Sequence, residues 1–346
     1  MGKLQAQRQI FAALLAALLT AAGPLCPPAA LAAAEAQDPS AQEAPVQEAG
    51  VPAQELADLA GAASLREMLD RKLSGRLEGG EVREKTPAPG SPTATDILAA
   101  TRVIAHGMGE TGGVATLNCL EGFLENYAKG VRVFEVDLRL TSDGKVVLRH
   151  DWRGGWQEGI SESVIPTREE FLSLPILEGY TPLSFQDLLL LLDEYPDVAV
   201  VTDSKFTDPD VAVVQFGAMT ADAKELGLSY VFDRILIQFY NQNMHDALAN
   251  AYHYPHYIYT LYNEGFSGTE SAFRTLADYC ARHGVEGITM WDTWWKPAFA
   301  PIAQEYGIRV YVHTVNDAAA AEELLASGVS AVYTDSLTDA GLQPGA

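Results

Sequence analysis

Short apolar segments alternate with amphipathic segments from Thr101 to Leu337, and this alternation restricts the fold more than any other feature of the chain. Seven amphipathic segments of helical character lie between the apolar ones, which are rich in Val and Ile. The apolar segments are "RVIAHG", "VRVFEVDLRL", "VAVVTDSK", "RILIQFY", "HYIYTLY", "GITMW", "RVYVHT" and "AVYTD". Buried strands joined by helical crossovers predict an α/β fold, a TIM (β/α)8 barrel.

A doubly wound open sheet is the alternative architecture for the same order of elements. Where such a sheet binds a dinucleotide, a glycine-rich loop directly follows its first strand. The residues after "RVIAHG" do not form that loop in the required pattern. The barrel is therefore the favoured fold, and we expect it to occupy residues 99–346.

The N-terminal residues have the composition of an export signal. Lys3 and Arg8 precede the apolar run "IFAALLAALLTAA", and small residues with A-x-A sites follow it. This run is shorter than the roughly 20 apolar residues that span a bilayer. We expect residues 1–36 to be a signal peptide with an approximate cleavage site, and the protein to be exported to the periplasm or the extracellular space.

Residues 37–98 are rich in Ala, Glu, Gln and Pro, a composition typical of a flexible acidic tether. Within them, "ELADLAGAASLREMLDRKLSGRLEGG" has leucines close to helical spacing, which indicates a short helix. Two cysteines, Cys119 and Cys280, remain after signal removal, and the sequence leaves open whether they pair.

The formal net charge of −23 argues against a nucleic-acid partner, because such partners require Lys and Arg to neutralise phosphates. The same charge disfavours broad adsorption to anionic membranes, although transient contact with a membrane surface is left open. No protein partner can be inferred from the sequence.

Polar residues stand where the predicted strands end, which is where barrel enzymes assemble their active sites. In chain order these residues are His106, Glu135, Asp137, Asp203, Lys205, Gln238, Trp291, His313 and Asp335.

Glu135 and Asp137 lie two residues apart on one strand, so their side chains point to the same face. Two neighbouring buried carboxylates repel each other and lose hydration, and a divalent cation is the simplest compensation. Asp203 at the end of the next barrel strand supplies a third carboxylate. The three predict a site for Ca²⁺ or Mg²⁺, which prefer oxygen ligands, rather than structural zinc.

Two histidines flank this cluster in the sequence. His106 ends the first strand, and the Asp-Gly turn in "TSDGKVVL" predicts a hairpin that folds His150 back near Glu135. Such a pair can supply a general base and a general acid, in an order that the sequence does not reveal. Lys205 faces the same way as Asp203, and it either offsets phosphate charge or pairs with Asp137.

Other aromatic and histidine residues have more ordinary interpretations. In "MWDTWWKP", Trp291 is expected to form an aromatic wall for the substrate, and Trp294 and Trp295 are expected to pack under the next helix. His313 points to the top of the barrel and is a candidate for substrate contact. The remaining histidines, expected to be solvated, are His245, His253, His256 and His283.

The run from "IAHG" through "NCLEGF", "FEVDLRLTSDGKVVLRHD" and "TDSK" to "HTVND" and "GVSAVYTDSL" resembles the glycerophosphodiester phosphodiesterase family. Within that family it is most similar to the bacterial branch grouped with phosphatidylinositol-specific phospholipase C-like proteins. The resemblance implies metal-ligand roles for Glu135 and Asp137 and acid/base roles for His106 and His150. Asp203 stands where family members usually have Glu.

Two departures from the family pattern affect the phosphate site. His106 is followed by Gly107 and Met108 instead of Arg-Gly, and "TLNC" replaces Pro-Glu-Asn-Thr. Arg139 and Arg149 are the candidates to replace the missing arginine.

The implied function is a metal-dependent phosphodiesterase, a phosphoric diester hydrolase that hydrolyses or cyclises glycerophosphodiester or phospholipid-headgroup phosphodiester bonds. One alternative is a non-catalytic barrel that binds metal and phosphate, and another is a phospholipase D-like lyase of the same superfamily. A glycosidase is disfavoured, because two acids on one strand do not readily flank a glycosidic bond.

Overall fold

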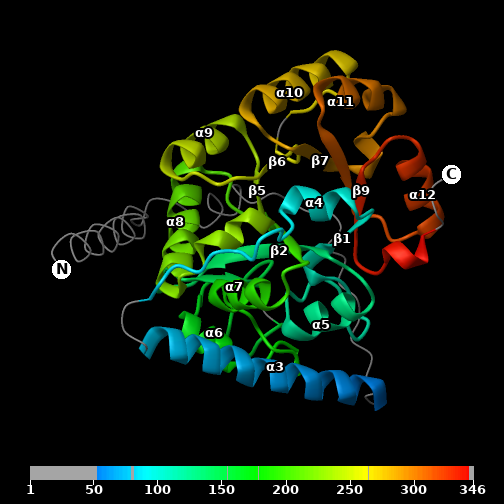
Figure 1. The fold of residues 1–346 in the computed structure, drawn as a ribbon. Coiled ribbons are helices and arrows are strands. Elements are labelled where there is room, and N and C mark those ends of the chain that lie inside the picture. The colour runs from blue at the N-terminus through cyan, green and yellow to red at the C-terminus, as the bar shows by residue number, and fades with distance from the viewer. Residues whose placement is uncertain (1–52, 79–81, 154, 178, 264, 343–346) are drawn as a thin grey trace. The chain divides into compact units, whose positions relative to one another are not determined.

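The computed structural model describes residues 53–78, 82–153, 155–177, 179–263 and 265–342. A closed barrel dominates the fold (Figure 1), since β1 pairs with β2 on one side and with β9 on the other. Within the described residues, eight of the nine strands are parallel and close the barrel in the order β1-β9-β8-β7-β6-β5-β4-β2. The ninth strand, β3, runs antiparallel to β2. The strands are β1 (Val103–Ala105), β2 (Val133–Leu140), β3 (Val146–Leu148), β4 (Ala199–Asp203), β5 (Ile235–Phe239), β6 (Tyr257–Thr260), β7 (Gly287–Trp291), β8 (Arg309–His313) and β9 (Ala331–Thr334).

The prediction of a TIM barrel is confirmed, and each of the eight apolar segments contributes one barrel strand. The expected signal peptide, residues 1–36, lies outside the described residues. Among the helices in the described part of the chain, none combines the length and apolarity needed to cross a bilayer. Cys119 and Cys280 are both buried and free, so they do not pair.

Helices surround the barrel on the outside and close one of its ends (Figure 1). They are α3 (Ala53–Glu78), α4 (Ala94–Ala99), α5 (Leu120–Ala128), α6 (Arg168–Ser173), α7 (Phe185–Glu194), α8 (Pro209–Leu226), α9 (Gln242–Ala251), α10 (Glu270–His283), α11 (Ala300–Tyr306) and α12 (Ala318–Ala326). Their ends follow from local sequence. In α8, for example, Asp208 caps the first turn, proline opens the helix, and Gly227 ends it in the left-handed conformation.

The barrel interior changes from apolar to polar along the strands. Because side chains alternate on a strand, Val133, Glu135 and Asp137 of β2 share the inner face. The first of these packs in an apolar cluster with Ala199, Leu236 and other residues from the starts of the strands. Glu135 and Asp137 lie farther along, and the carboxyl ends of the strands therefore carry the polar groups.

Helix α4 closes the apolar end of the barrel. Its Ala94, Ile97 and Leu98 belong to the same cluster as the inward side chains at the starts of the strands. Thr93 caps the helix, with Asp96 accepting a hydrogen bond from the Thr93 backbone in return. This helix spans the expected boundary between the tether and the barrel domain.

Helix α3, which contains the expected leucine-rich helix, packs on the outer layer. Leu69 is fully buried, and Arg66 lies 2.6 Å from the buried carboxylate of Asp187 in α7. Lys72 forms a second ion pair, with Glu194. The helix is therefore attached by one apolar contact surface and by charges that face α7.

Candidate active site

The register of two neighbouring strands brings the three carboxylates together. In the parallel pairing of β2 with β4, Asp137 lies directly opposite Asp203, and Glu135 lies two residues earlier on the same inner face. One oxygen from each carboxylate lies within 4.8 Å of the other two, and all three residues are buried. The expected cluster of Glu135, Asp137 and Asp203 is present in the structure.

A buried lysine balances part of this charge. Lys205 Nζ lies 2.7 Å from Asp137 Oδ1 and also contacts Asp203 Oδ2. Burial opposes its charge, but Asp137 and Asp203 raise the pKa of Lys205 above its ordinary value, so the ammonium stays charged. Tyr240 donates a hydrogen bond to the other oxygen of Asp203.

Lys205 does not balance all of the negative charge of the three carboxylates. Burial and the Asp137 carboxylate raise the pKa of Glu135 well above its usual range. Burial would raise the pKa of Asp137 too, but Lys205 and His150 keep it below its usual range. Three carboxylates against one lysine leave an excess of negative charge that an added divalent cation would neutralise, and all-oxygen ligands suit such an ion. These residues therefore fit a divalent metal site.

His106 is held by a carboxylate from the opposite end of the chain. Its Nδ1 lies 2.9 Å from Asp335 Oδ1, and Asn316 donates to the other oxygen of Asp335 at 2.6 Å. Burial alone would lower the pKa of His106, but the hydrogen bond to Asp335 and the charge of Glu135 raise it to about 9. With Nδ1 engaged by Asp335, Nε2 is the nitrogen left for proton exchange with a substrate.

His150 has a matching arrangement. The β2–β3 hairpin pairs Leu138 with Leu148, and the chain leaves β3 directly afterwards. This places His150 near enough to Asp137 for the imidazole to lower the pKa of the Asp137 carboxyl. His150 Nδ1 lies 3.0 Å from Asp151 Oδ2. The two histidines are therefore each paired through Nδ1 with an aspartate.

The two candidate arginines contact the backbone around His150. Arg139 Nε donates to the carbonyl of His150 at 2.9 Å, and Arg149 Nε donates to the carbonyl of Asp151. Burial lowers the pKa of Arg149 to about 10. Arg139 shares the inner face of β2 with Glu135, whereas the guanidinium of Arg149 contacts the following loop.

Backbone and amide contacts orient the acids. Gly107 donates its backbone N–H to Glu135 at 2.6 Å, and Asn118 donates its side-chain amide to Asp137 at 2.6 Å. Gly107 has a φ of +52°, and a Cβ atom there would meet the Cα of Thr116 at 2.5 Å. The glycine that follows His106 is thus required by conformation and by space.

The aromatic residues at the ends of β6, β7 and β8 form one wall near this cluster. His313 stacks on Trp291 with ring centroids 4.2 Å apart, and Tyr262 lies 4.1 Å from His313. Burial lowers the pKa of His313 well below its usual range. Within the described residues, Nε2 of His313 has no hydrogen-bond partner. His313 is therefore a neutral imidazole with a buried nitrogen that lacks a partner in the described structure.

Several of these contacts were not predicted from the sequence. Asp335 was expected only at a strand end, without a role, and Asp151 and Tyr240 had no expected role. The only sequence signal for Asp335 was the final "YTD" of the last strand. It places an acid at a barrel strand end, a position more typical of an active site than of a structural role.

Two of the histidines expected to be solvated are not. His245 is 3 % exposed and hydrogen-bonds with Tyr279 at 2.8 Å, and His256 pairs with Glu286. Packing between helices places His245 in the interior, which a helical position in the sequence does not reveal. Trp295 is buried and donates to Ser327, in agreement with the packing role expected for it.

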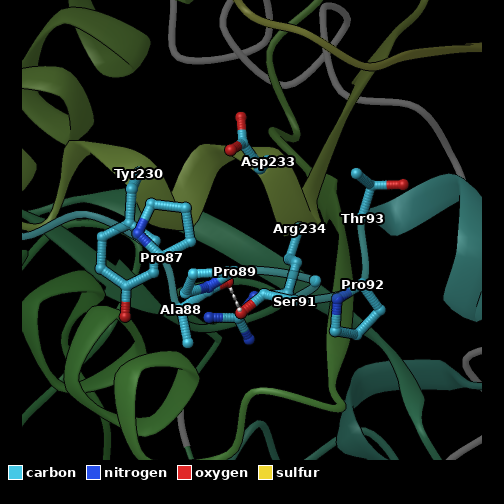
Figure 2. A pocket seen from close by; sticks show the side chains of 10 residues that line it. Pro87, Ala88, Pro89, Ser91, Pro92, Thr93, Tyr230, Asp233 and Arg234 are labelled. Carbon is cyan, nitrogen blue, oxygen red and sulfur yellow. Dashed lines mark hydrogen bonds between the residues drawn. The ribbon is translucent and has the colours of Figure 1, made fainter.

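A cavity of about 250 Å³ lies elsewhere, beside the start of β5 (Figure 2). It is lined by the proline-rich segment 87–93 and by Tyr230, Asp233 and Arg234. The guanidinium of Arg234 donates to the carbonyl oxygens of Tyr195 and Val198, so this arginine already has structural partners. The cavity adjoins the apolar end of the barrel and does not contain the carboxylate cluster.

The fold and the site together define a class: a (β/α)8 barrel with three buried carboxylates and two aspartate-paired histidines at the carboxyl ends of its strands. Residues 112–211 match the sequence profile of the Glycerophosphoryl diester phosphodiesterase family. This match confirms the family resemblance carried by the motifs and the expected enzyme class, a phosphoric diester hydrolase.

Solved structures of similar fold carry related names. A candidate glycerophosphoryl diester phosphodiesterase from Silicibacter pomeroyi DSS-3 is 23 % identical, with a TM-score of 0.53, over 75 % of this chain and 94 % of its own. A glycerophosphodiester phosphodiesterase from Parabacteroides distasonis is 20 % identical, with a TM-score of 0.54, over 68 % and 92 %. A phosphodiesterase from Oleispira antarctica, in complex with the product sn-glycerol-3-phosphate, is 15 % identical, with a TM-score of 0.54, over 69 % and 95 %. These likenesses show a shared barrel fold.

Proposed function

We propose that the protein is a divalent-metal-dependent phosphodiesterase that uses His106 and His150 as its acid/base pair. The observation that carries this proposal is the placement of three buried carboxylates beside two histidines that are each paired with an aspartate. A barrel that only bound phosphate would have no need for two oriented imidazoles. This arrangement supports turnover over the non-catalytic alternative.

The metal is proposed to be Ca²⁺ or Mg²⁺, held by Glu135, Asp137 and Asp203. Both ions take oxygen ligands, and the cluster offers only carboxylates. When bound, such an ion supplies positive charge that stabilises negative charge on the phosphoryl oxygens. Lys205 adds a fixed positive charge beside the same acids and is proposed to contact a phosphate oxygen.

The histidines are proposed to move protons at the two ends of the reacting phosphodiester. One imidazole takes the proton of the attacking hydroxyl, a new O–P bond forms, the O–P bond to the leaving group breaks, and the other imidazole protonates the departing oxygen. Asp335 fixes the tautomer of His106, and Asp151 does the same for His150, so that Nε2 of each ring faces the reaction. Such an oriented pair contributes about 10²–10⁴-fold to the rate.

The substrate is proposed to be a glycerophosphodiester or a phospholipid-headgroup phosphodiester. Two observations support this class: the family match over residues 112–211, and the product sn-glycerol-3-phosphate bound to the structurally similar enzyme from Oleispira antarctica. The wall of Trp291 and His313 is proposed to contact the alcohol portion of the substrate, and Arg139 to approach the phosphate. The neutral His313 can donate or accept one hydrogen bond from a hydroxyl group.

The test is turnover of purified protein on glycerophosphodiesters, phosphatidylinositol and lysophospholipids, followed by ³¹P NMR in Ca²⁺, Mg²⁺ or EDTA. We expect cleavage that requires metal and is lost in His106→Ala. A cyclic phosphate signal would identify attack by a hydroxyl of the substrate itself, and a linear monoester would identify attack by water. Metal binding without turnover on any of these substrates would favour the non-catalytic barrel.

Export to the periplasm or the extracellular space is a further part of the proposal. It rests on the basic residues, apolar run and A-x-A sites within residues 1–36. N-terminal sequencing of protein recovered outside the cytoplasm tests it. A new N-terminus near residue 37 is expected, and an intact Met1 on the recovered protein would contradict the proposal.

A further inference from the structure

A second group of side chains of the kinds that ligate metals lies on the outside of the barrel, where α9 and α10 meet (Figure 1). His245 and Asp246 come from α9, and His283 is the last residue of α10. One ligand atom from each of the three residues lies within 4.8 Å of the other two. Neither the family match nor the proposed catalysis uses these residues.

His245 provides the fixed member of this group. Its side chain is 4 % exposed and lies among aromatic rings, with the centroids of Phe239 and Tyr257 at 4.8 and 4.9 Å. These contacts hold the ring in one orientation. Nδ1 faces outward, because Tyr279 Oη lies 2.8 Å from it and Asp246 Oδ1 lies 3.4 Å from it.

His283 and Asp246 approach Nδ1 of His245 from the solvent side. The side chain of Asp246 is 59 % exposed, and His283 is also exposed. The ring of His283 is placed by stacking on Tyr279 at 4.2 Å, and its centroid lies 5.5 Å from that of His245. A hydrogen bond from Tyr279 alone would account for the burial of His245, but it does not require a second imidazole and a carboxylate at the same place.

The donor set indicates which ion would bind. Two imidazole nitrogens and one carboxylate oxygen suit Zn²⁺ and similar borderline cations, whereas Ca²⁺ and Mg²⁺ prefer oxygen alone. Ligands about 2.1 Å from a tetrahedral zinc ion lie roughly 3.4 Å from one another. His245 Nδ1 and Asp246 Oδ1 are already 3.4 Å apart, whereas the exposed side chain of His283 and the hydroxyl of Tyr279, 2.8 Å from Nδ1, both have to move.

We propose that His245, Asp246 and His283 form a zinc site that links α9 to α10, with its fourth position open to water. An ion on Nδ1 of His245 requires the side chain of Tyr279 to shift away from that atom, and its hydroxyl would then donate to Asp246 Oδ1, now 3.5 Å away, and orient that ligand from outside the coordination sphere. The site is separate from the carboxylate cluster in the barrel and selects a different class of ion.

The experiment measures zinc binding to the full chain by competition with a chromophoric chelator, in excess Ca²⁺ so that the barrel carboxylates are occupied. His283→Ala and Asp246→Asn alter exposed side chains and should leave the fold intact. His253→Ala is the matched control, because His253 is an exposed histidine outside the group. We expect one zinc per chain in the wild type and in the control, and an affinity at least tenfold lower in the other two variants.

A second readout is the thermal midpoint with and without Zn²⁺. A ligand that binds only the folded state raises this midpoint. We therefore expect zinc to raise it in the wild type and in His253→Ala, and to leave it nearly unchanged in His283→Ala. Equal zinc affinity in the wild type and His283→Ala, or no zinc binding by the wild type in Ca²⁺, would overturn the proposal.

Discussion

The 2.9 Å contact between His106 Nδ1 and Asp335 Oδ1 joins residues that are 229 positions apart in the sequence. It forms where β1 pairs with β9, the strand pair that closes the barrel. Ala105 is the register partner of Thr334, so the next residue on each strand lies at the same height. Closure of the barrel therefore determines the orientation of His106.

We expect Asp335→Asn to reduce kcat by about 10²-fold or more, because an amide no longer fixes the tautomer and orientation of His106. KM should change little, since the proposed role of Asp335 is to position His106 and not to bind the substrate. Steady-state kinetics on the preferred diester measure both parameters. Asp278→Asn, which alters an exposed carboxylate paired only with Arg282 in the described structure, serves as the control. A kcat equal to that of the control would remove Asp335 from the proposed mechanism.

Lys205→Met should destabilise the metal-free protein by about 3–5 kcal/mol, because it leaves Asp137 and Asp203 buried without their cation. Added Ca²⁺ or Mg²⁺ should recover part of this loss by supplying the missing charge. Thermal unfolding in EDTA and in excess cation measures the difference. Lys129→Met is the control, since its ion pair with Glu125 is exposed. An equal loss with and without cation would argue against a shared role for the lysine and a metal.

Glu135→Gln should abolish metal-dependent turnover while raising the free energy of unfolding in EDTA by about 1–3 kcal/mol. Burial and the neighbouring Asp137 carboxylate both raise the pKa of Glu135. The negative charge of Glu135 is therefore unfavourable without a cation. Glutamine keeps an oxygen that can accept the Gly107 hydrogen bond. Chemical denaturation in EDTA, together with an activity assay, checks both parts. Lower stability in EDTA would show that the acid is not under repulsion.

Gly107→Ala should destabilise the protein more than Gly284→Ala. Both glycines have positive φ, which costs an alanine about 1–2 kcal/mol. At Gly284 a Cβ meets nothing within 4 Å, whereas at Gly107 it meets the Cα of Thr116 at 2.5 Å. Overpacking adds about 1–3 kcal/mol at Gly107 alone. Urea denaturation of the two variants measures the difference, and equal losses would contradict the close approach.

The ion pair of His256 with Glu286 should make stability depend on pH. Burial would lower the pKa of His256, but the hydrogen bond with Glu286 raises it, and that bond holds the pKa of Glu286 below its usual value despite burial. The histidine contribution is complete below about pH 6.5 and is lost as pH rises through the folded pKa. The glutamate contribution is complete above about pH 4.5 and is lost as pH falls through the lower folded pKa.

Both contributions are present between about pH 4.5 and 6.5. We therefore expect the thermal midpoint of the wild type to exceed that of Glu286→Gln most strongly in this window, and the difference to shrink above it. The measurement is thermal unfolding of both proteins from pH 4 to 9. A difference that grows toward pH 9 would reverse the assigned sign.

The sequence predicted the barrel well because its strands are buried on both faces. Such strands appear as continuous runs of Val and Ile, and eight of these runs separated by helical segments leave few other architectures. Glu135 and Asp137 were equally visible, since a two-residue spacing on a strand fixes their common face. The pairing with Asp203 followed once the next strand was recognised.

Contacts between distant segments were harder to predict. The His106–Asp335 pair depends on the closure of the barrel, and no local pattern encodes it. Helix α4 has only six residues, of which three are buried, too few to produce a visible periodicity. His245 was expected to be solvated because its burial depends on how α9 packs against α10, which single-helix patterns do not specify.

Helix α4 packs against the starts of the strands and closes that end of the barrel. Ile97 and Leu98 fill the end where the strands begin, so the polar end is the side from which the buried acids are approached. A substrate that enters there has to leave, as product, along the route by which it came.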